Sequence, residues 1–298
     1  MTSSSNQRTK LAFKRPRRIA ANTWIWTDNF PTHQSAIIKK VSNLGFDGIE
    51  IPISVARINI AELRESLFET GRGLVPIVLV GGTPSEDISS GISEIRRNGE
   101  KRIHRSIEIC NSLGGQLVGG PMYASTGNPS YYSEVRRTTI LSRSVESMKR
   151  MADFAAQKKI KIAIEPICRY DNSFLNTVQQ AKSFLREVGR KNVGLLLDTF
   201  HLNIEEKSVN AAILDAGENL FHFHACENDR GVLGTGHIDW NEIADALDEI
   251  GYSGWLSIES FNPKEHALAS KMKVWRSLAK NQDELAREGL EFLRRRLA

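Results

Sequence analysis

The chain lacks the features that mark several common protein classes. Its three cysteines, Cys110, Cys168 and Cys226, are an odd number without C-x-x-C spacing, which argues against a disulfide framework or a zinc knuckle. It has no run of about 18 apolar residues, so we expect no membrane span. No strand candidate is followed by a G-x-G-x-x-G or P-loop sequence. We therefore expect a cytoplasmic protein that uses neither a structural zinc nor a nucleotide fold.

Acidic residues are absent from positions 1–18, which contain six basic ones: Arg8, Lys10, Lys14, Arg15, Arg17 and Arg18. The whole chain has 40 basic and 35 acidic residues, so 34 basic residues face 35 acidic ones after position 18. Because the body is close to neutral, we expect no nucleic-acid partner. The segment 1–18 has no apolar h-region, and we expect a disordered basic tail and not a secretory signal.

Short apolar stretches alternate with amphipathic helical patterns about every 30 residues. The strand candidates are 19–25, 47–52, 74–80, 116–120, 160–165, 193–198, 220–225 and 254–259. Eight such units in alternation are typical of a parallel sheet that closes on itself. We predict an α/β fold, a single (β/α)₈ TIM barrel over residues 19–298. A doubly wound sheet is the alternative, which the missing glycine-rich loop disfavours.

The last four strand candidates each end on a side chain that can bind a metal: Glu165, Asp198, His224 and Glu259. The carboxyl ends of parallel barrel strands meet at one mouth, so these four side chains should converge. Two glutamates, one aspartate and one histidine form an oxygen-rich set that suits Mn²⁺, Co²⁺ or Mg²⁺ better than a structural zinc. Any one alone could be a helix N-cap or an ion-pair partner, but all four together indicate a metalloenzyme acting on an oxygen-rich substrate such as a sugar.

Three more side chains follow these strands closely. His201, in DTFH, could be a fifth ligand or donate a hydrogen bond to a substrate oxygen. Arg230, in HACENDRG, has the permanent charge and forked donors that suit a developing enolate oxygen. Asp171 could position His201 or a substrate hydroxyl, or simply cap a loop.

Other polar residues and loops near the strand ends have weaker claims. We expect His222 to be a core histidine below the metal and His237 to have a structural role on a turn. Glu50 closes the second strand candidate, in GIEIP, and we do not expect it to reach the site. The long loop 121–133 follows the fourth strand on the catalytic side, where it is either a substrate lid or a plain surface loop.

Three runs in the second half resemble the ketose 3-epimerases of the tagatose/allulose type, within the xylose-isomerase-like sugar isomerase/epimerase superfamily. They are EPICRYDNSFLNT from Glu165, LDTFHLNIEE from Leu197 and HACENDRGVLGTGHIDW from His224, and KVWRSLA from Lys273 is similar too. The resemblance implies one Mn²⁺ (or Co²⁺/Mg²⁺) per subunit, held by Glu165, Asp198, His224 and Glu259. It also implies that Glu165 and Glu259 act as the acid/base pair, while His201, Arg230 and Asp171 bind the substrate.

Parts of the chain depart from the epimerase pattern. Asp171 stands where these epimerases carry a glutamate, and the segments AANTWIW and GGPMYAS also differ. These regions shape the substrate pocket, so the resemblance says least about which sugar is bound. It also implies a homo-oligomer, a dimer or a tetramer.

The resulting prediction is a ketose 3-epimerase that inverts C3 of a free ketose through a metal-bound enediolate, with two glutamates exchanging the proton. Two alternatives stay open: an aldose–ketose isomerase, and a lyase or deglycosidase that cleaves a 3-keto glycoside by β-elimination with a small partner subunit. Type-IV apurinic endonucleases share the barrel but need histidines on the second and third strands. Here those strands end in GIEIPI and VPIVLVGG, without a histidine, so we do not expect a DNA-repair enzyme.

Overall fold

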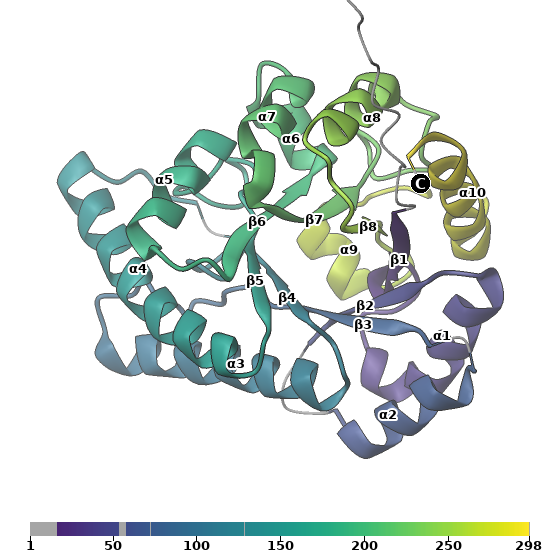
Figure 1. Cartoon of the computed structure of the whole chain (residues 1–298), viewed down its shortest axis with the longest axis horizontal. Helices are drawn as coiled ribbons and strands as arrows, with labels where there is room; N and C mark the ends of the chain where they lie inside the picture. Colours follow the sequence, from purple (N-terminus) through teal and green to yellow (C-terminus); the bar gives the residue numbers. More distant parts are fainter. Residues whose placement is uncertain (1–16, 54–57, 72, 128, 298) are drawn as a thin grey trace, which may run out of the picture.

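The computed structural model describes residues 17–53, 58–71, 73–127 and 129–297, in which eight parallel strands close into a barrel in sequence order. β1 pairs with both β2 and β8, which closes the ring, and Figure 1 shows the helices arranged around it. The predicted TIM barrel is therefore confirmed. The strands are β1 Arg18–Asn22, β2 Gly48–Pro52, β3 Val75–Leu79, β4 Leu117–Gly120, β5 Lys161–Ile164, β6 Val193–Asp198, β7 Leu220–Ala225 and β8 Trp255–Ile258.

Local capping chemistry sets several helix boundaries. Thr177 and Gln180 form a reciprocal capping box at the start of α5, and the Asp239 side chain accepts the first free N–H groups of α8. The helices are α1 Phe30–Leu44, α2 Ile60–Glu69, α3 Ser93–Ser112, α4 Glu134–Gln157, α5 Val178–Val188, α6 Thr199–Glu205, α7 Val209–Ala216, α8 Trp240–Glu249, α9 His266–Met272 and α10 Gln282–Arg296, with short 3-10 turns η1 Thr23–Ile25 and η2 Gly217–Asn219.

The first strand is shorter than its apolar pattern predicts. The candidate 19–25 ends as a strand at Asn22, because the Asn22 side chain accepts the Trp24 N–H and starts the 3-10 turn η1. An apolar pattern alone does not reveal such a side-chain cap. The turn brings Trp24 to the wall of the cavity at the carboxyl end of the barrel.

Side chains alternate between the inside of the barrel and the layer between strands and helices. A small apolar cluster fills the inside: Ala20, Ile77, Leu79, Leu117, Ala163, Leu196 and Trp255. A much larger buried cluster joins the outer faces of the strands to the helices. By the same alternation, Asp198 shares the inner side of the barrel with Leu196 of this cluster.

The predicted disordered tail, residues 1–18, falls mostly outside the described residues, but its last two positions belong to the barrel. Arg18 opens β1. Arg17 is only 8% exposed, donates to the carbonyl oxygens of Tyr252 and Leu297 and pairs with Asp248. These bonds join the start of the first strand to the last elements of the chain, next to the seam where the barrel closes.

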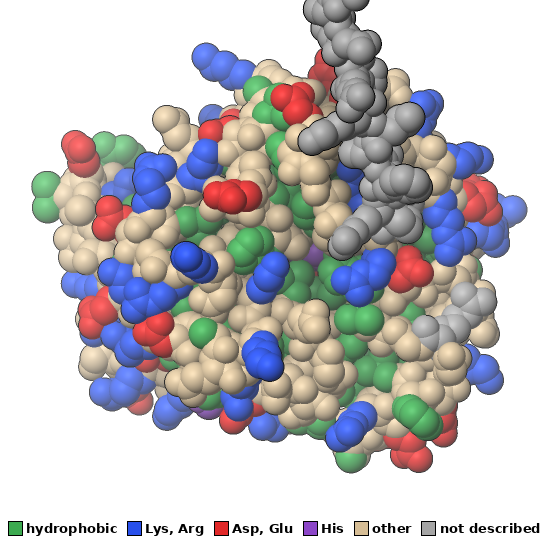
Figure 2. Space-filling view, in the orientation of Figure 1, with side chains coloured by type: hydrophobic (Ala, Val, Ile, Leu, Met, Phe, Trp, Pro, Cys, Tyr) green, Lys and Arg blue, Asp and Glu red, His purple; other side chains and the backbone are tan. Residues whose placement is uncertain are grey.

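Two general features of the described chain agree with the composition. Its helices include none long and apolar enough to cross a membrane. On the face shown in Figure 2, basic and acidic side chains are interspersed around the periphery, as expected for a body that is close to neutral.

Candidate active site

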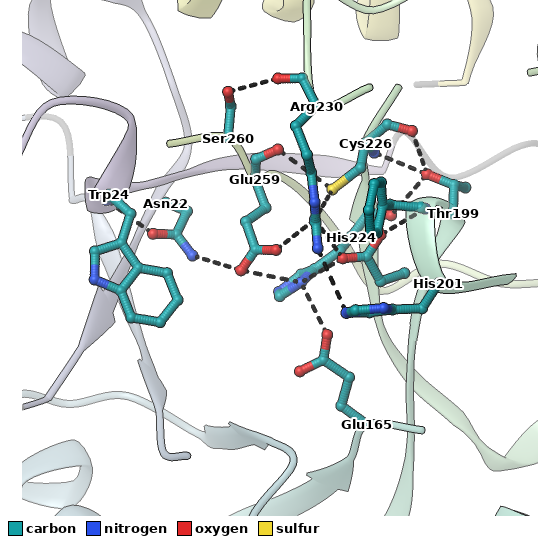
Figure 3. Close-up of polar contacts among 12 residues, drawn as sticks. Asn22, Trp24, Glu165, Thr199, His201, His224, Cys226, Arg230, Glu259 and Ser260 are labelled. Carbon is teal, nitrogen blue, oxygen red and sulfur yellow. Dashed lines mark hydrogen bonds and ion pairs between the residues drawn. The ribbon is translucent and has the colours of Figure 1, made fainter. Parts of the chain in front are cut away.

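The four predicted metal ligands lie together at the carboxyl end of the barrel. Asp198 and His224 belong to β6 and β7, while Glu165 and Glu259 directly follow β5 and β8, and none is more than 5% exposed. The His224 Nδ1 atom lies 3.7 Å from Glu165 Oε1, 3.9 Å from Asp198 Oδ2 and 3.7 Å from Glu259 Oε1. Figure 3 shows Glu165 and Glu259 approaching His224 from opposite sides.

The surroundings of His224 Nδ1 fit a divalent cation. This nitrogen is buried and has no hydrogen-bond partner, although buried polar atoms nearly always have one. The three carboxylate oxygens are too distant to serve as partners. Ligands that each lie about 2.1 Å from one ion are roughly 3–4 Å apart, which matches the distances found. The donor set, one nitrogen and carboxylate oxygens, also suits Mn²⁺ or Co²⁺.

Glu50 contacts this cluster from the barrel interior, contrary to our expectation. It is fully buried, and its Oε2 atom lies 2.6 Å from His222 Nε2 and 3.0 Å from His224 Nε2. Asn22 Nδ2 donates to Glu50 Oε1 and to Glu259 Oε1. Burial alone would raise the pKa of Glu50, but His224 and His222 hold it well below its ordinary value. His222 is a buried core histidine, as predicted.

Arg230 joins two of the four predicted ligands. Its Nη1 donates to Asp198 Oδ2 at 2.7 Å and to Glu259 Oε2 at 2.6 Å. The guanidinium lies 4.1 Å from the ring centre of Phe200 and 5.1 Å from that of Phe261, an arrangement that favours a cation. The backbone of Arg230 has a φ of 68°, so the loop accepts a conformation that costs free energy in order to place this side chain.

The carboxylates of the cluster differ in their proton affinity. Burial raises the pKa of Glu165 well above its ordinary value, and the neighbouring charges of Glu259 and Asp198 raise it further. Burial also raises the pKa of Glu259, to about 7, against the opposing effect of Arg230. For Asp198 the pKa is instead well below its ordinary value, because Arg230 and His224 outweigh burial. Two glutamates whose pKa values are raised by burial suit proton transfer.

His201 offers a hydrogen-bond donor to the cavity. Its Nδ1 accepts the backbone N–H of Cys168 at 3.1 Å, and burial lowers its pKa to about 4. The ring is therefore neutral with its proton on Nε2. Nε2 lies 3.4 Å from Arg230 Nη2, so two donor groups face the same space, where a substrate oxygen could accept from both.

Asp171 lines the cavity but does not contact His201 in the way we considered. Its Oδ1 accepts from Lys273 Nζ at 2.8 Å, and its Oδ2 accepts from Cys168 Sγ at 3.5 Å. The backbone of Cys168, not Asp171, orients the His201 ring. Asp171 therefore ties the segment after α9 to the segment after β5.

Two polar residues of this site were not predicted from the sequence: Asn22, described above, and Glu227. Glu227 is fully buried and accepts from the Gly234 N–H and from Trp240 Nε1. It thereby holds the loop that carries Arg230. The available signal was its place in the run HACEN, between His224 and Arg230. His237 lies on an exposed turn outside the site, as predicted.

A cavity of about 410 Å³ opens above the cluster. Glu165, Glu259, His201 and Arg230 form part of its lining, together with Trp24, Phe200 and Phe261. Met272 of α9 and the residues that follow it complete the wall. From the loop 121–133, Pro121, Thr126 and Gly127 face the cavity, so the first half of that loop is part of the pocket.

Known proteins are similar in sequence to this chain over most of its length. The family model described as xylose isomerase-like TIM barrel matches residues 38–296. The D-psicose 3-epimerase of Agrobacterium fabrum is 33% identical over 279 residues, which cover 90% of this chain and 95% of that protein. The 3-dehydro-D-guloside 4-epimerase of Escherichia coli is 28% identical over 77% of this chain and 88% of its own.

A solved structure extends the likeness to three dimensions. The D-allulose 3-epimerase from Methylomonas sp., in complex with D-allulose, matches with a TM-score of 0.88 and 32% identity over 94% of this chain and 98% of that one. These matches confirm the resemblance that the sequence motifs indicated. The chain belongs to the xylose isomerase-like TIM barrel family and, within it, to the ketose 3-epimerase enzymes.

Proposed function

We propose that this protein is a divalent-metal-dependent ketose 3-epimerase that inverts C3 of a free ketose. The observation that carries the proposal is the placement of Glu165 and Glu259. Their carboxylates follow β5 and β8, lie on opposite sides of His224 and are each 3.7 Å from its Nδ1 atom. Inversion of a carbon requires a proton to leave from one face and return to the other, which two such groups can do.

The four predicted ligands would have two functions in this reaction, metal binding and proton transfer. Glu165, Asp198, His224 and Glu259 would hold one Mn²⁺ or Co²⁺ per subunit, and Mg²⁺ fits the same oxygen-rich set. When bound, the ion supplies Lewis acidity that acidifies the C–H next to the carbonyl. One glutamate then accepts the C3 proton, and the other donates a proton on the opposite face.

His201 and Arg230 hold the substrate at its carbonyl end. The Nε2–H of His201 and the Nη2 of Arg230 point into the same space and can donate to one oxygen. Their fixed positions stabilise negative charge that develops on this oxygen as the proton leaves C3. Asp171 contributes a carboxylate to a more distant part of the wall, where it can accept from a sugar hydroxyl.

A reaction on a 3-keto glycoside is the second candidate, and two observations favour it. The E. coli relative is named as an epimerase of a 3-dehydro glycoside. The cavity of about 410 Å³ also falls in the range of sites that take drug-sized ligands, which leaves room for a group attached to the sugar. The same residues would remove the proton next to the keto group, and loss of a β-substituent would follow.

Incubation of the metal-loaded protein with D-fructose, D-tagatose and L-ribulose in D₂O, followed by NMR, tests the proposal. Deuterium at C3 together with the C3 epimer would establish a ketose 3-epimerase. Exchange at C3 without an epimer would favour elimination. No exchange on any of the three ketoses, with bound Mn²⁺ confirmed, would overturn the free-ketose proposal and direct the assay to 3-keto glycosides.

The assembly and location of the protein are part of the same proposal. We propose a cytoplasmic homo-oligomer, a dimer or a tetramer, that acts on a small sugar. Light scattering of the full chain would give its mass in solution. A protein that turns over ketoses and has the mass of a monomer would contradict the proposed assembly.

A further inference from the structure

The polar network beneath His224 uses a carboxylate that the proposed reaction does not need. Glu50 is fully buried, and its two oxygens meet three nitrogen atoms: Asn22 Nδ2 at 2.8 Å, His222 Nε2 at 2.6 Å and His224 Nε2 at 3.0 Å. We propose that Glu50 is a positioning residue that fixes the tautomer of His224, so that Nδ1 presents its lone pair to the metal. The inference rests on the metal site of the proposed function.

Hydrogen-bond chemistry sets the proton positions in this network. An ionised carboxylate only accepts hydrogen bonds, so both imidazoles must carry a proton on Nε2 where they meet Glu50. A neutral His224 with its proton on Nε2 has a bare lone pair on Nδ1. That nitrogen is the one without a hydrogen-bond partner, and it faces the carboxylates of Glu165, Asp198 and Glu259.

The amide of Asn22 has a fixed orientation and connects Glu50 to a second predicted ligand. Its Oδ1 accepts the Trp24 backbone N–H at 2.9 Å, so its Nδ2 must be the atom that faces the carboxylates. Nδ2 donates to Glu50 and, at 3.2 Å, to Glu259 Oε1. The network that begins at Glu50 thus orients two of the four predicted ligands from strands β1 and β2.

The distances argue against a second metal ion between Glu50 and the two histidines. The contacts from Glu50 Oε2 to the two Nε2 atoms, 2.6 and 3.0 Å, are hydrogen-bond lengths. Atoms that share an ion are roughly 3–4 Å apart, and the 2.6 Å contact between Glu50 and His222 is too short for that. Hydrogen bonding of a metal-ligating histidine to a buried carboxylate is instead a recurrent device that sets ring orientation and tautomer.

The substitution Glu50→Gln tests the inference because it keeps the shape and changes the hydrogen bonding. A glutamine offers one acceptor oxygen and one NH₂ donor to three groups that all donate to Glu50. Since Glu50 Oε2 meets both imidazoles and Oε1 accepts from Asn22, the NH₂ group must face one side or the other. Facing the imidazoles, it makes His224 accept on Nε2 and carry its proton on Nδ1, which removes that lone pair from the metal site. Facing Asn22, it breaks the hydrogen bond that holds Asn22 beside Glu259. We expect the Kd for Mn²⁺, measured by electron paramagnetic resonance of the free ion, to rise about 10- to 100-fold.

Glu100→Gln is the control, since the Glu100 carboxylate is also mostly buried, accepts from Ser147 Oγ and pairs with Arg150, but contacts no predicted ligand. Both variants should unfold at a lower temperature than wild type, but only Glu50→Gln should lose Mn²⁺ affinity. Equal losses of affinity in the two variants, or wild-type affinity in folded Glu50→Gln, would overturn the inference.

A measurement on the wild type covers the case in which Glu50→Gln does not fold. With ¹⁵N-labelled histidine and Mg²⁺ bound, NMR should show His224 protonated on Nε2 and bare on Nδ1; the opposite tautomer would refute the role of Glu50. These readouts need no sugar turnover. Failure of the wild type to bind any divalent ion would instead count against the proposed function itself.

Discussion

The two halves of the barrel carry different chemistry. Strands β5–β8 end at or next to ionisable side chains, namely Glu165, Asp198, His224 and Glu259. Strands β3 and β4 end at Leu79 and Gly120, which line the cavity without any charge. From β1 and β2, Asn22 and Glu50 reach across the interior and hydrogen-bond to the groups of the other half.

This difference separates reaction chemistry from shape and orientation. The second half holds the groups that can bind an ion and move a proton, and burial and mutual charge displace the pKa values of its carboxylates. The first half orients these groups through Asn22 and Glu50 and supplies part of the cavity wall. In the (β/α)₈ fold a chemistry can change through the strand ends and loops while the barrel stays the same.

The largest effect should come from Glu165 and Glu259, the proposed acid/base pair of the second half. Changing Glu165 or Glu259 to Gln removes the proton carrier but keeps its size, and general acid–base catalysis contributes about 10²–10⁴-fold. We expect the rate of deuterium incorporation at C3 of a ketose substrate to fall by about that factor. Glu146→Gln, on the exposed surface of α4, is the control and should keep the wild-type rate. Either site variant within about ten-fold of wild type would show that its glutamate does not carry the proton.

The next largest effect should be on stability, through Arg230. Removing one partner of a buried charge pair costs about 3–5 kcal/mol, because the remaining carboxylates lose their counter-charge. We expect Arg230→Met to lower the free energy of unfolding by about that amount in urea titrations of the metal-free protein. Arg276→Met is the control, since its pair with Asp229 is exposed and should contribute no more than about 1 kcal/mol. A similar loss in both variants would mean that the Arg230 pairs are no stronger than surface pairs.

The difference between the two halves also determines which parts of the site could be predicted from the sequence. Strand order and the carboxyl-end rule were enough to bring Glu165, Asp198, His224 and Glu259 together, because each lies at the same level of a regular barrel. His201 and Arg230 followed from their short distance along the chain to these strand ends. These predictions depend only on periodicity and on local chain length.

Contacts across the barrel were harder to predict. In GIEIP, Glu50 belongs to an apolar strand, and its partner His222 is 172 residues away. The contact between Glu50 and His222 depends on which residues of β2 and β7 lie at the same level inside the barrel, and no local sequence pattern specifies this. A charged residue in an otherwise buried strand was nevertheless a usable signal, since a buried carboxylate needs partners. The pair of Asp171 and Lys273 depends similarly on two loops 102 residues apart.

A change in the wall of the first half should affect shape without affecting metal binding. Gly120 has a φ of 122°, and a Cβ atom there would lie 2.6 Å from the carbonyl oxygen of Val80. We expect Gly120→Ala to lower the free energy of unfolding by about 1–3 kcal/mol, since the backbone conformation is one that alanine rarely adopts. The Mn²⁺ Kd of the folded variant should stay at the wild-type value. A higher Kd would show that the wall also positions the metal ligands, and the division of roles between the two halves would then be wrong.

The smallest effect should come from Asp171, at the edge of the second half. Its ion pair with Lys273 is partly exposed, so its contribution should be on the order of 1 kcal/mol, or about five-fold in a binding constant. We expect Asp171→Asn to raise the KM for a ketose by no more than this factor and to leave kcat unchanged, because its proposed role is to bind substrate and not to move a proton. Asp215→Asn, which breaks a comparable pair with Lys182 away from the cavity, should change neither constant. A large fall in kcat for Asp171→Asn would place this residue among the groups that act on the reacting carbon, and the reactive part of the site would then extend beyond the four strand ends.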